Sequence, residues 1–98
     1  MIRGTTPTHT FNVNVDLTNA DVIYITYKQG NDTVVEKVKS DCEITSTSVS
    51  VTLTQEDTLK FNASDVEIQI RARFPDDSAI ASNIMRTSVT RVLKSGVI

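Results

Sequence analysis

Apolar and polar residues alternate strictly at both ends of residues 48–74. In the first part the apolar residues Val49, Val51 and Leu53 take one parity. In the second part the apolar parity is held by Val66, Ile68, Ile70, Ala72 and Phe74. A repeat of two residues is typical of a strand with one buried face. The pattern therefore predicts two half-buried strands, and the rest of the chain is arranged around them.

The segment between these two strands has a different character. Thr54 is followed three residues later by Asp57, a spacing at which a hydroxyl and a carboxylate cap a helical turn reciprocally. We therefore expect one short helical turn at Gln55–Leu59. Leu59 and Phe61 would then fold back over the core as a lid.

Five further strands are expected from the remaining apolar pattern. They are residues 9–17, 22–28, 33–40, 42–45 and 79–92. Residues 22–28 carry apolar side chains on both faces, which predicts a central strand, whereas the charges at Glu36, Lys37 and Lys39 predict that the next strand lies at an edge. Gly30 and Asn31 tolerate the positive φ of a tight hairpin between the two. The alternation slips at residues 83–86, which predicts a β-bulge that lets the last strand serve both sheets.

The chain is predicted to be one all-β domain over residues 1–98, with an extended arm at residues 1–8 and a short tail at residues 94–98. Val, Ile and Thr far outnumber Leu and Ala, and β-branched residues favour strands. We expect an immunoglobulin-like antiparallel sandwich of about seven strands with one short helical turn. The expected core is Phe11, Val13, Ile23, Ile25, Val49, Val51, Leu53, Leu59, Phe61, Val66, Ile68, Ile70 and Phe74.

Charge and cysteine content narrow the class of protein. The 10 basic and 12 acidic residues are interspersed and give a net charge of −2, so we expect no nucleic-acid binding. No apolar run approaches the roughly 20 residues of a membrane-spanning helix, and residues 1–10 lack the apolar centre of a signal peptide. Cys42 is the only cysteine, so no internal disulfide exists. This fits a reducing cytoplasm or a protein made there, and Cys42 is expected to be a small core residue.

The residues that could perform chemistry are few. His9 is the only histidine, with no cysteine or acidic residue near it in sequence, and reads as a surface residue at the start of a strand. One histidine and one cysteine cannot form a tetrahedral zinc site, and Asp76 and Asp77 lack the spacing of a calcium loop.

Paired carboxylates are the other candidates for chemistry. Glu56 with Asp57, or Asp65 with Glu67, could serve glycoside hydrolysis, but a chain with five aromatic residues scarcely provides a deep aromatic-lined cleft. We therefore expect no catalytic, cofactor-binding or metal-binding residue, and a protein that is not an enzyme.

Two features could serve binding. One is a polar stripe on a single strand face, formed by Glu67, Gln69, Arg71 and Arg73 and extended by Arg86 and Arg91. It could be a solvated face with weak cross-strand ion pairs, or an assembly surface, since Arg is enriched at interfaces. The other feature is the apolar ends of the chain. The predicted interface residues are Met1, Ile2, Arg71, Arg73, Val97 and Ile98.

Several stretches together carry a resemblance to a known group of proteins. They are MIRGTTPTHTF at the start, VTLTQEDTLKF in the middle, then VEIQIRARF and AIASN, and VLKSGVI at the end. The chain resembles small proteins from tail or baseplate gene neighbourhoods of phages and prophages of gut Firmicutes, and it is similar to the N-terminal immunoglobulin-like domain of phage upper baseplate proteins.

The resemblance implies a non-enzymatic structural protein of the virion, made in the bacterial cytoplasm and located in a tail or baseplate. Its partners would be other tail or baseplate proteins and copies of itself, with no nucleic acid or membrane involved. The alternative is a small module that binds a carbohydrate or a cell-surface ligand. Sugar binding requires exposed aromatic rings, and the candidates are Tyr24, Tyr27 and Phe74, so burial of both tyrosines would remove the main support for that alternative.

Overall fold

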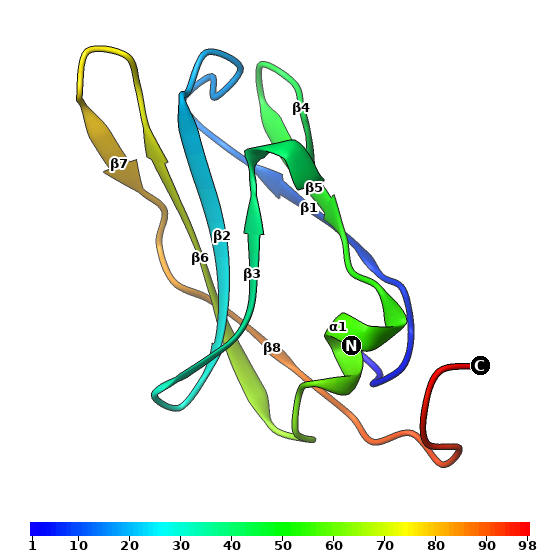
Figure 1. The fold of residues 1–98 in the computed structure, drawn as a ribbon. Coiled ribbons are helices and arrows are strands. Elements are labelled where there is room, and N and C mark those ends of the chain that lie inside the picture. The colour runs from blue at the N-terminus through cyan, green and yellow to red at the C-terminus, as the bar shows by residue number, and fades with distance from the viewer.

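The computed structural model describes all 98 residues, which form a sandwich of two antiparallel sheets (Figure 1). The smaller sheet has the order β1-β5-β4 and consists of β1 (Thr8–Asn12), β5 (Ser48–Thr52) and β4 (Cys42–Ile44). The larger sheet has the order β3-β2-β6-β7 and consists of β3 (Asp32–Val38), β2 (Val22–Gln29), β6 (Asp65–Arg73) and β7 (Ala79–Ala81), with β8 (Met85–Ser88) also paired to β6. The expected immunoglobulin-like all-β sandwich is confirmed.

The helical turn between β5 and β6 has the bounds and the cap expected from the sequence. It is α1 (Gln55–Leu59). The Thr54 hydroxyl accepts a hydrogen bond from the Asp57 amide at 3.1 Å, and the Asp57 carboxylate accepts one from the Thr54 amide at 2.9 Å. Two amides at the start of the helix, which have no partner inside it, are thereby satisfied. Phe61 follows the turn and is buried, as predicted.

The hairpin and the sheet positions around it also agree with the sequence. β2 lies between β3 and β6, and β3 is an edge strand. Gln29 pairs with Asp32 across the hairpin, and Gly30 takes a φ of 60° there. Of the two loop residues only Gly30 has a positive φ. The register of β2 against β3 shifts between Tyr27 and Lys28. In the last segment residues 82–84 face only residues 69 and 70 of β6, so one extra residue lies where the predicted bulge at residues 83–86 begins.

The first predicted strand is too long. Residues 9–17 were expected to form one strand, but β1 ends at Asn12. The strand ends there because its partner β5 begins at Ser48, opposite Asn12. The chain then turns at Asp16, whose carboxylate accepts hydrogen bonds from the amide and the hydroxyl of Thr18, at 2.9 and 2.7 Å. Val15 is therefore exposed, whereas Leu17 is carried into the core.

The last predicted strand divides in two. Residues 79–92 form β7 and β8, separated by residues 82–84, and both pair only with β6, so this segment does not serve both sheets. The Ser82 hydroxyl accepts a hydrogen bond from the Ile70 amide at 3.0 Å and takes a place in the ladder that a backbone carbonyl would otherwise hold. β3 likewise ends at Val38, because the Asp41 carboxylate accepts from its amide and a 3₁₀ turn (Lys39–Asp41) leads into β4.

Most of the predicted core is buried between the sheets. Four predicted members are only half-buried: Phe11, Val13, Leu59 and Phe74. Phe11, Val13 and Phe74 pack against the edge of the core. Leu59 lies under the N-terminal arm, where its Cδ2 is 3.5 Å from the position that a Cβ would occupy if Gly4 carried one. The core also contains residues that were not predicted as members: Leu17, Ala20, Tyr27, Val35, Ala72 and Val89.

The N-terminal arm is folded onto its own domain. Met1 and Arg3 exchange backbone hydrogen bonds with Thr90, just beyond the end of β8, at 2.8 and 3.1 Å. The buried hydroxyl of Thr58 in α1 accepts from the Gly4 amide at 2.9 Å and donates to the Thr5 carbonyl at 2.8 Å. The arm thus joins the outer edge of the larger sheet to the start of β1 in the smaller one.

The reciprocal cap of α1 generates a prediction for stability. Replacing Thr54 by Ala removes the oxygen that accepts from the Asp57 amide, and loss of a cap of this kind costs about 1 kcal/mol. We expect the free energy of unfolding to fall by about that amount in urea denaturation. Thr54→Ser keeps the hydroxyl and is the matched control, which should stay close to the wild type. Equal losses in the two variants would contradict the role of the hydroxyl.

Candidate functional site

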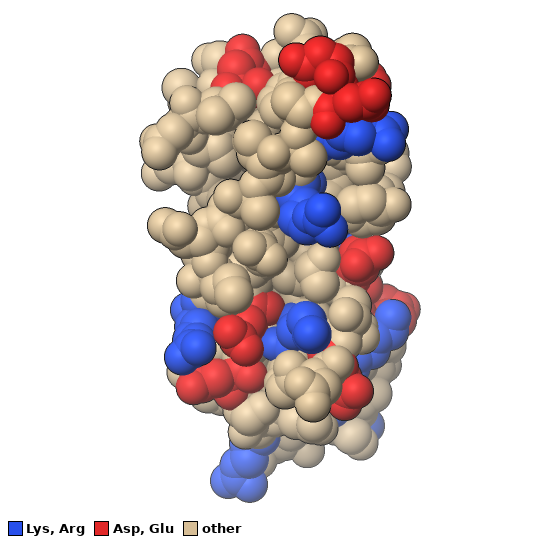
Figure 2. All heavy atoms as spheres, turned by 90° about the vertical axis from the view of Figure 1, so that its left-hand side faces the viewer, with Lys and Arg blue, Asp and Glu red and all other residues tan.

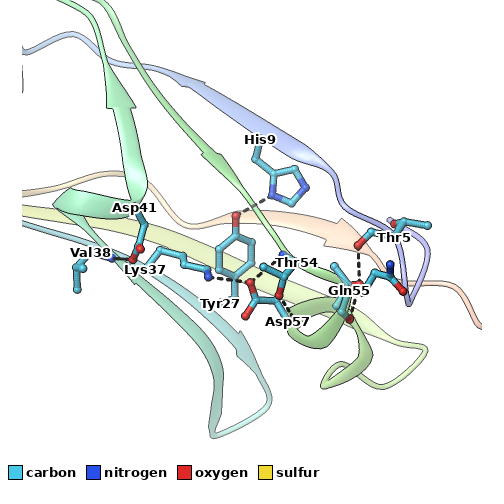
Figure 3. Close-up of polar contacts among 10 residues, drawn as sticks. Thr5, His9, Tyr27, Lys37, Val38, Asp41, Thr54, Gln55 and Asp57 are labelled. Carbon is cyan, nitrogen blue, oxygen red and sulfur yellow. Dashed lines mark hydrogen bonds and ion pairs between the residues drawn. The ribbon is translucent and has the colours of Figure 1, made fainter. Parts of the chain in front are cut away.

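The most concentrated set of polar side chains lies between the two sheets and the helical turn (Figure 3). His9 of β1 and Tyr27 of β2 meet there, with 2.7 Å between Nδ1 and the phenol oxygen. Close by, the Lys37 amine from β3 forms an ion pair of 2.7 Å with the Asp57 carboxylate of α1. Two polar contacts therefore join β1 to β2 and β3 to α1. Neither contact was predicted from the sequence.

Each group in this set is already engaged inside the domain. The Tyr27 ring is fully buried, with its centroid 6.0 Å from that of Phe61, and its hydroxyl is matched by His9. Burial raises the pKa of Tyr27, and the nearby Cys42 and Asp57 add to the rise, so the phenol keeps its proton. Neither of the two main surface grooves is lined by His9 or Tyr27. The contact joins the two sheets, and the His9 side of it is half-buried.

The Lys37–Asp57 pair is also structural. Burial by itself raises the pKa of the Asp57 carboxyl, but the hydrogen bonds from Lys37 and Thr54 outweigh that effect, and the pKa is lowered. The two side chains retain 16% and 12% of their exposure, so the pair is largely shielded from water. It ties α1 to β3 at the end of the sandwich that α1 covers. The paired carboxylates considered for hydrolysis therefore include one, Asp57, that is committed to a lysine.

The single cysteine lies at the margin of the core. Cys42 is half-buried and packs against the core, as expected, and its thiol donates to the Val38 carbonyl at 3.4 Å. Burial raises the pKa of this thiol, and the charge of Asp41 adds to the rise, which disfavours the nucleophilic thiolate. No three side chains among His, Cys, Asp and Glu lie together as metal ligands would. Neither helical segment is long and apolar enough to span a bilayer.

One surface groove contains an exposed aromatic ring. It has a volume of about 670 Å³ and lies beside Tyr24, which is 41% exposed, and Val38, which is 39% exposed. The amine of Lys39 at its wall is held by the Ala20 carbonyl at 2.6 Å. Tyr27, the second aromatic ring considered for sugar binding, is buried. The carbohydrate alternative therefore depends on Tyr24 alone at this groove.

A second groove opens on the side of the sandwich between β1 and β7. It has a volume of about 510 Å³, and no charged residue lines it. Val13 and Val15, which follow β1, line one wall, and Ile80 of β7 and Met85 of β8 line the other. Val15 is 45% exposed and Ile80 is 38% exposed. The two sheets are therefore not closed along this side, and apolar side chains of the interior reach the surface.

The predicted interface residues fall into two regions. Arg71 and Arg73 lie on the outer face of β6, are exposed, and form no ion pair, whereas Arg86 lies 3.5 Å from Glu67 as a cross-strand pair. Figure 2 shows the molecule from the side that lies at the left in Figure 1. Charges gather towards the top and in the lower third of this view, and an uncharged area lies between them along its left.

The apolar ends of the chain lie together near α1 (Figure 1). Met1 is half-buried and packs against the core, whereas Ile2, Val97 and Ile98 are 51%, 54% and 88% exposed. The backbone of Ile98 is held by the Gln55 side chain, which accepts from its amide at 2.9 Å. The structure does not bring the ends and the arginine face into one site, and the interface assignment of all six residues stays a prediction.

The single histidine generates a pH prediction. Burial lowers the pKa of His9, and the positive N-terminal amine adds to the effect, so the unfolded chain binds a proton more readily than the folded one. The free energy of unfolding should therefore fall as the pH drops through about 6.5, the ordinary histidine value, towards the lower folded pKa. Denaturation at pH 7.5 and lower values measures this slope. His9→Gln should flatten it, and an unchanged slope in that variant would show that another group is responsible.

Comparison of the chain with protein-family models, curated proteins and solved structures finds no match. The functional interpretation therefore depends on the resemblance carried by the sequence and on the surfaces of the sandwich.

Proposed function

We propose that this chain is a non-enzymatic structural protein of a phage or prophage tail or baseplate, and that it acts by binding other tail or baseplate proteins and copies of itself. The resemblance of its sequence stretches supports the tail or baseplate setting. One structural observation supports assembly as the activity: the open apolar side of the sandwich between β1 and β7, where Val15 and Ile80 are exposed beside an uncharged groove. Apolar surface of this kind gains from contact with another protein.

The distribution of polar groups supports the same proposal. The histidine and the tyrosine that could perform proton transfer satisfy each other between the sheets. Arg71 and Arg73 form no ion pair and lie on an exposed sheet face, where arginine suits a protein partner. The side chains of His9 and Tyr27 thus stabilise the fold, whereas Arg71 and Arg73 remain available for contact with another protein.

The proposal predicts that the chain is part of the particle. Tail particles purified from the bacterium that carries the gene should contain the chain in a fixed ratio to the other tail proteins, as measured by quantitative mass spectrometry. Deleting the gene should remove the chain and yield defective tails, and re-expression should restore them. Recovery of the chain only in the unassembled fraction of the lysate would overturn the proposal.

A tyrosine variant separates this function from the carbohydrate alternative. Tyr24→Ala removes the aromatic ring at the first groove but leaves the side between β1 and β7 intact. Incorporation into particles should stay at the wild-type level. A wild type that binds glycans on an array, with loss of that binding in the variant, would favour the alternative.

A further inference from the structure

We infer that β1 is a self-pairing edge, through which a second copy of this chain adds its own β1 antiparallel across a two-fold axis. The two small sheets would then form one continuous sheet. This inference rests on the proposed assembly function, because it names the partner that binds at the edge strand beside the open side of the sandwich.

The outer backbone of β1 is free. Val13 donates to the Thr47 carbonyl and the Pro7 carbonyl accepts from Leu53, so the odd-numbered residues of this segment face β5. In an antiparallel pair the intervening residues direct both their N–H and their C=O away from the partner. The remaining backbone groups of β1, at Thr8, Thr10 and Asn12, therefore point to the outer edge, where no strand is paired. Such a row is a template for another strand.

The edge of β1 lacks the features that usually block pairing. No charged residue occurs between Arg3 and Asp16, so two copies of this edge meet without like-charge repulsion. β3, by contrast, exposes Glu36 and turns Lys37 inward, and both devices protect an edge. β4 and β7 have three residues each.

The edge of β8 is partly occupied from within the chain. The arm binds there through Met1, whose amine donates to the Ser88 carbonyl at 2.8 Å and whose carbonyl accepts from the Thr90 amide at 2.8 Å. β1 is therefore the longest edge that is both uncovered and uncharged.

Apolar side chains beside β1 are left half-covered. Phe11 and Val13 point inward and pack against the core but remain half-buried, and Val15 just beyond them is 45% exposed. With Thr10 of one copy opposite Thr10 of the other, the second copy places its His9 beside Phe11 and its Pro7 beside Val13, so both half-buried side chains gain cover. Because the axis is two-fold, the same contact forms twice, once at each end of the paired strands.

The register follows from the strand itself. Thr10 is the middle residue of β1, and pairing of Thr10 with Thr10 of the second copy places Thr8 opposite Asn12. All of these residues have outward N–H and C=O groups, so each facing pair would exchange hydrogen bonds in both directions. Their side chains lie on the exposed outer face of the small sheet, where Thr10 already bonds Ser50 at 2.9 Å.

The test is the oligomeric state of the full chain, measured by sedimentation velocity from micromolar to millimolar concentration. The wild type should form a dimer. Thr10→Pro removes the outward N–H, which the monomer does not use, and proline is tolerated at such an edge position. The dimer loses a hydrogen bond from each copy, so its Kd should rise about tenfold or more. Ser46→Lys, in the turn between β4 and β5, is a surface control and should leave the Kd unchanged.

A charge-pair experiment guards against a folding defect in the proline variant. Thr10→Lys and Thr10→Glu place like charges opposite each other at the two-fold axis when each variant is alone, and opposite charges when the two are mixed. Each should dimerise more weakly than the wild type, and the mixture should recover a heterodimer. A wild type that stays monomeric at millimolar concentration, or a mixture no more associated than its components, would overturn the inference.

The outcome is separable from that of the proposed function. A monomeric chain that is still recovered in purified tail particles would remove β1 self-pairing and keep the tail role. A chain that dimerises through β1 but is missing from the particles would remove the tail role and keep β1 self-pairing.

Discussion

The inner face of the five-stranded sheet must be covered, and the three-stranded sheet opposite is too narrow to cover all of it. The rest of the molecule responds to this mismatch. At one end the capped turn α1 and Phe61 supply the missing cover, and the N-terminal arm lies over Leu59. On the side between β1 and β7 nothing in the chain does so, and a groove remains with Val15 and Ile80 at its rim. The mismatch between the sheets thus determines both the lid and the open side.

Polar contacts hold the sheets together where apolar packing is incomplete. The buried phenol of Tyr27 would be costly without a hydrogen-bond partner, and His9 from the facing sheet provides it. Lys37 points inward from an edge strand and is neutralised by Asp57 of the lid. In a domain of this size, which buries only about two thirds of its unfolded surface, such contacts favour one arrangement of the two sheets over others that would leave these groups unpaired.

The edges of the sheets differ in their protection, and this difference bears on assembly. β3 carries charges, β4 and β7 are short, and the outer side of β8 holds the arm. Only β1 combines a free backbone with an uncharged sequence and half-covered apolar side chains. A monomer with such an edge is exposed to uncontrolled pairing, whereas an assembly component can use the same edge as a specific contact.

The sequence by itself determined the local structure of this protein. Alternation located β2, β5 and β6, and the Thr54 and Asp57 spacing located α1, because each depends on residues within a few positions of one another. Only the tertiary structure decided the contact of His9 with Tyr27, the pairing of Lys37 with Asp57, the end of β1 and the division of the last strand. Those features join residues far apart in the chain, or depend on a side chain such as that of Ser82 competing for a backbone partner. The apolar residues near β1 could be identified in the sequence. Their exposure depends on the width of the smaller sheet, which has only three strands, and no local sequence pattern predicts that width.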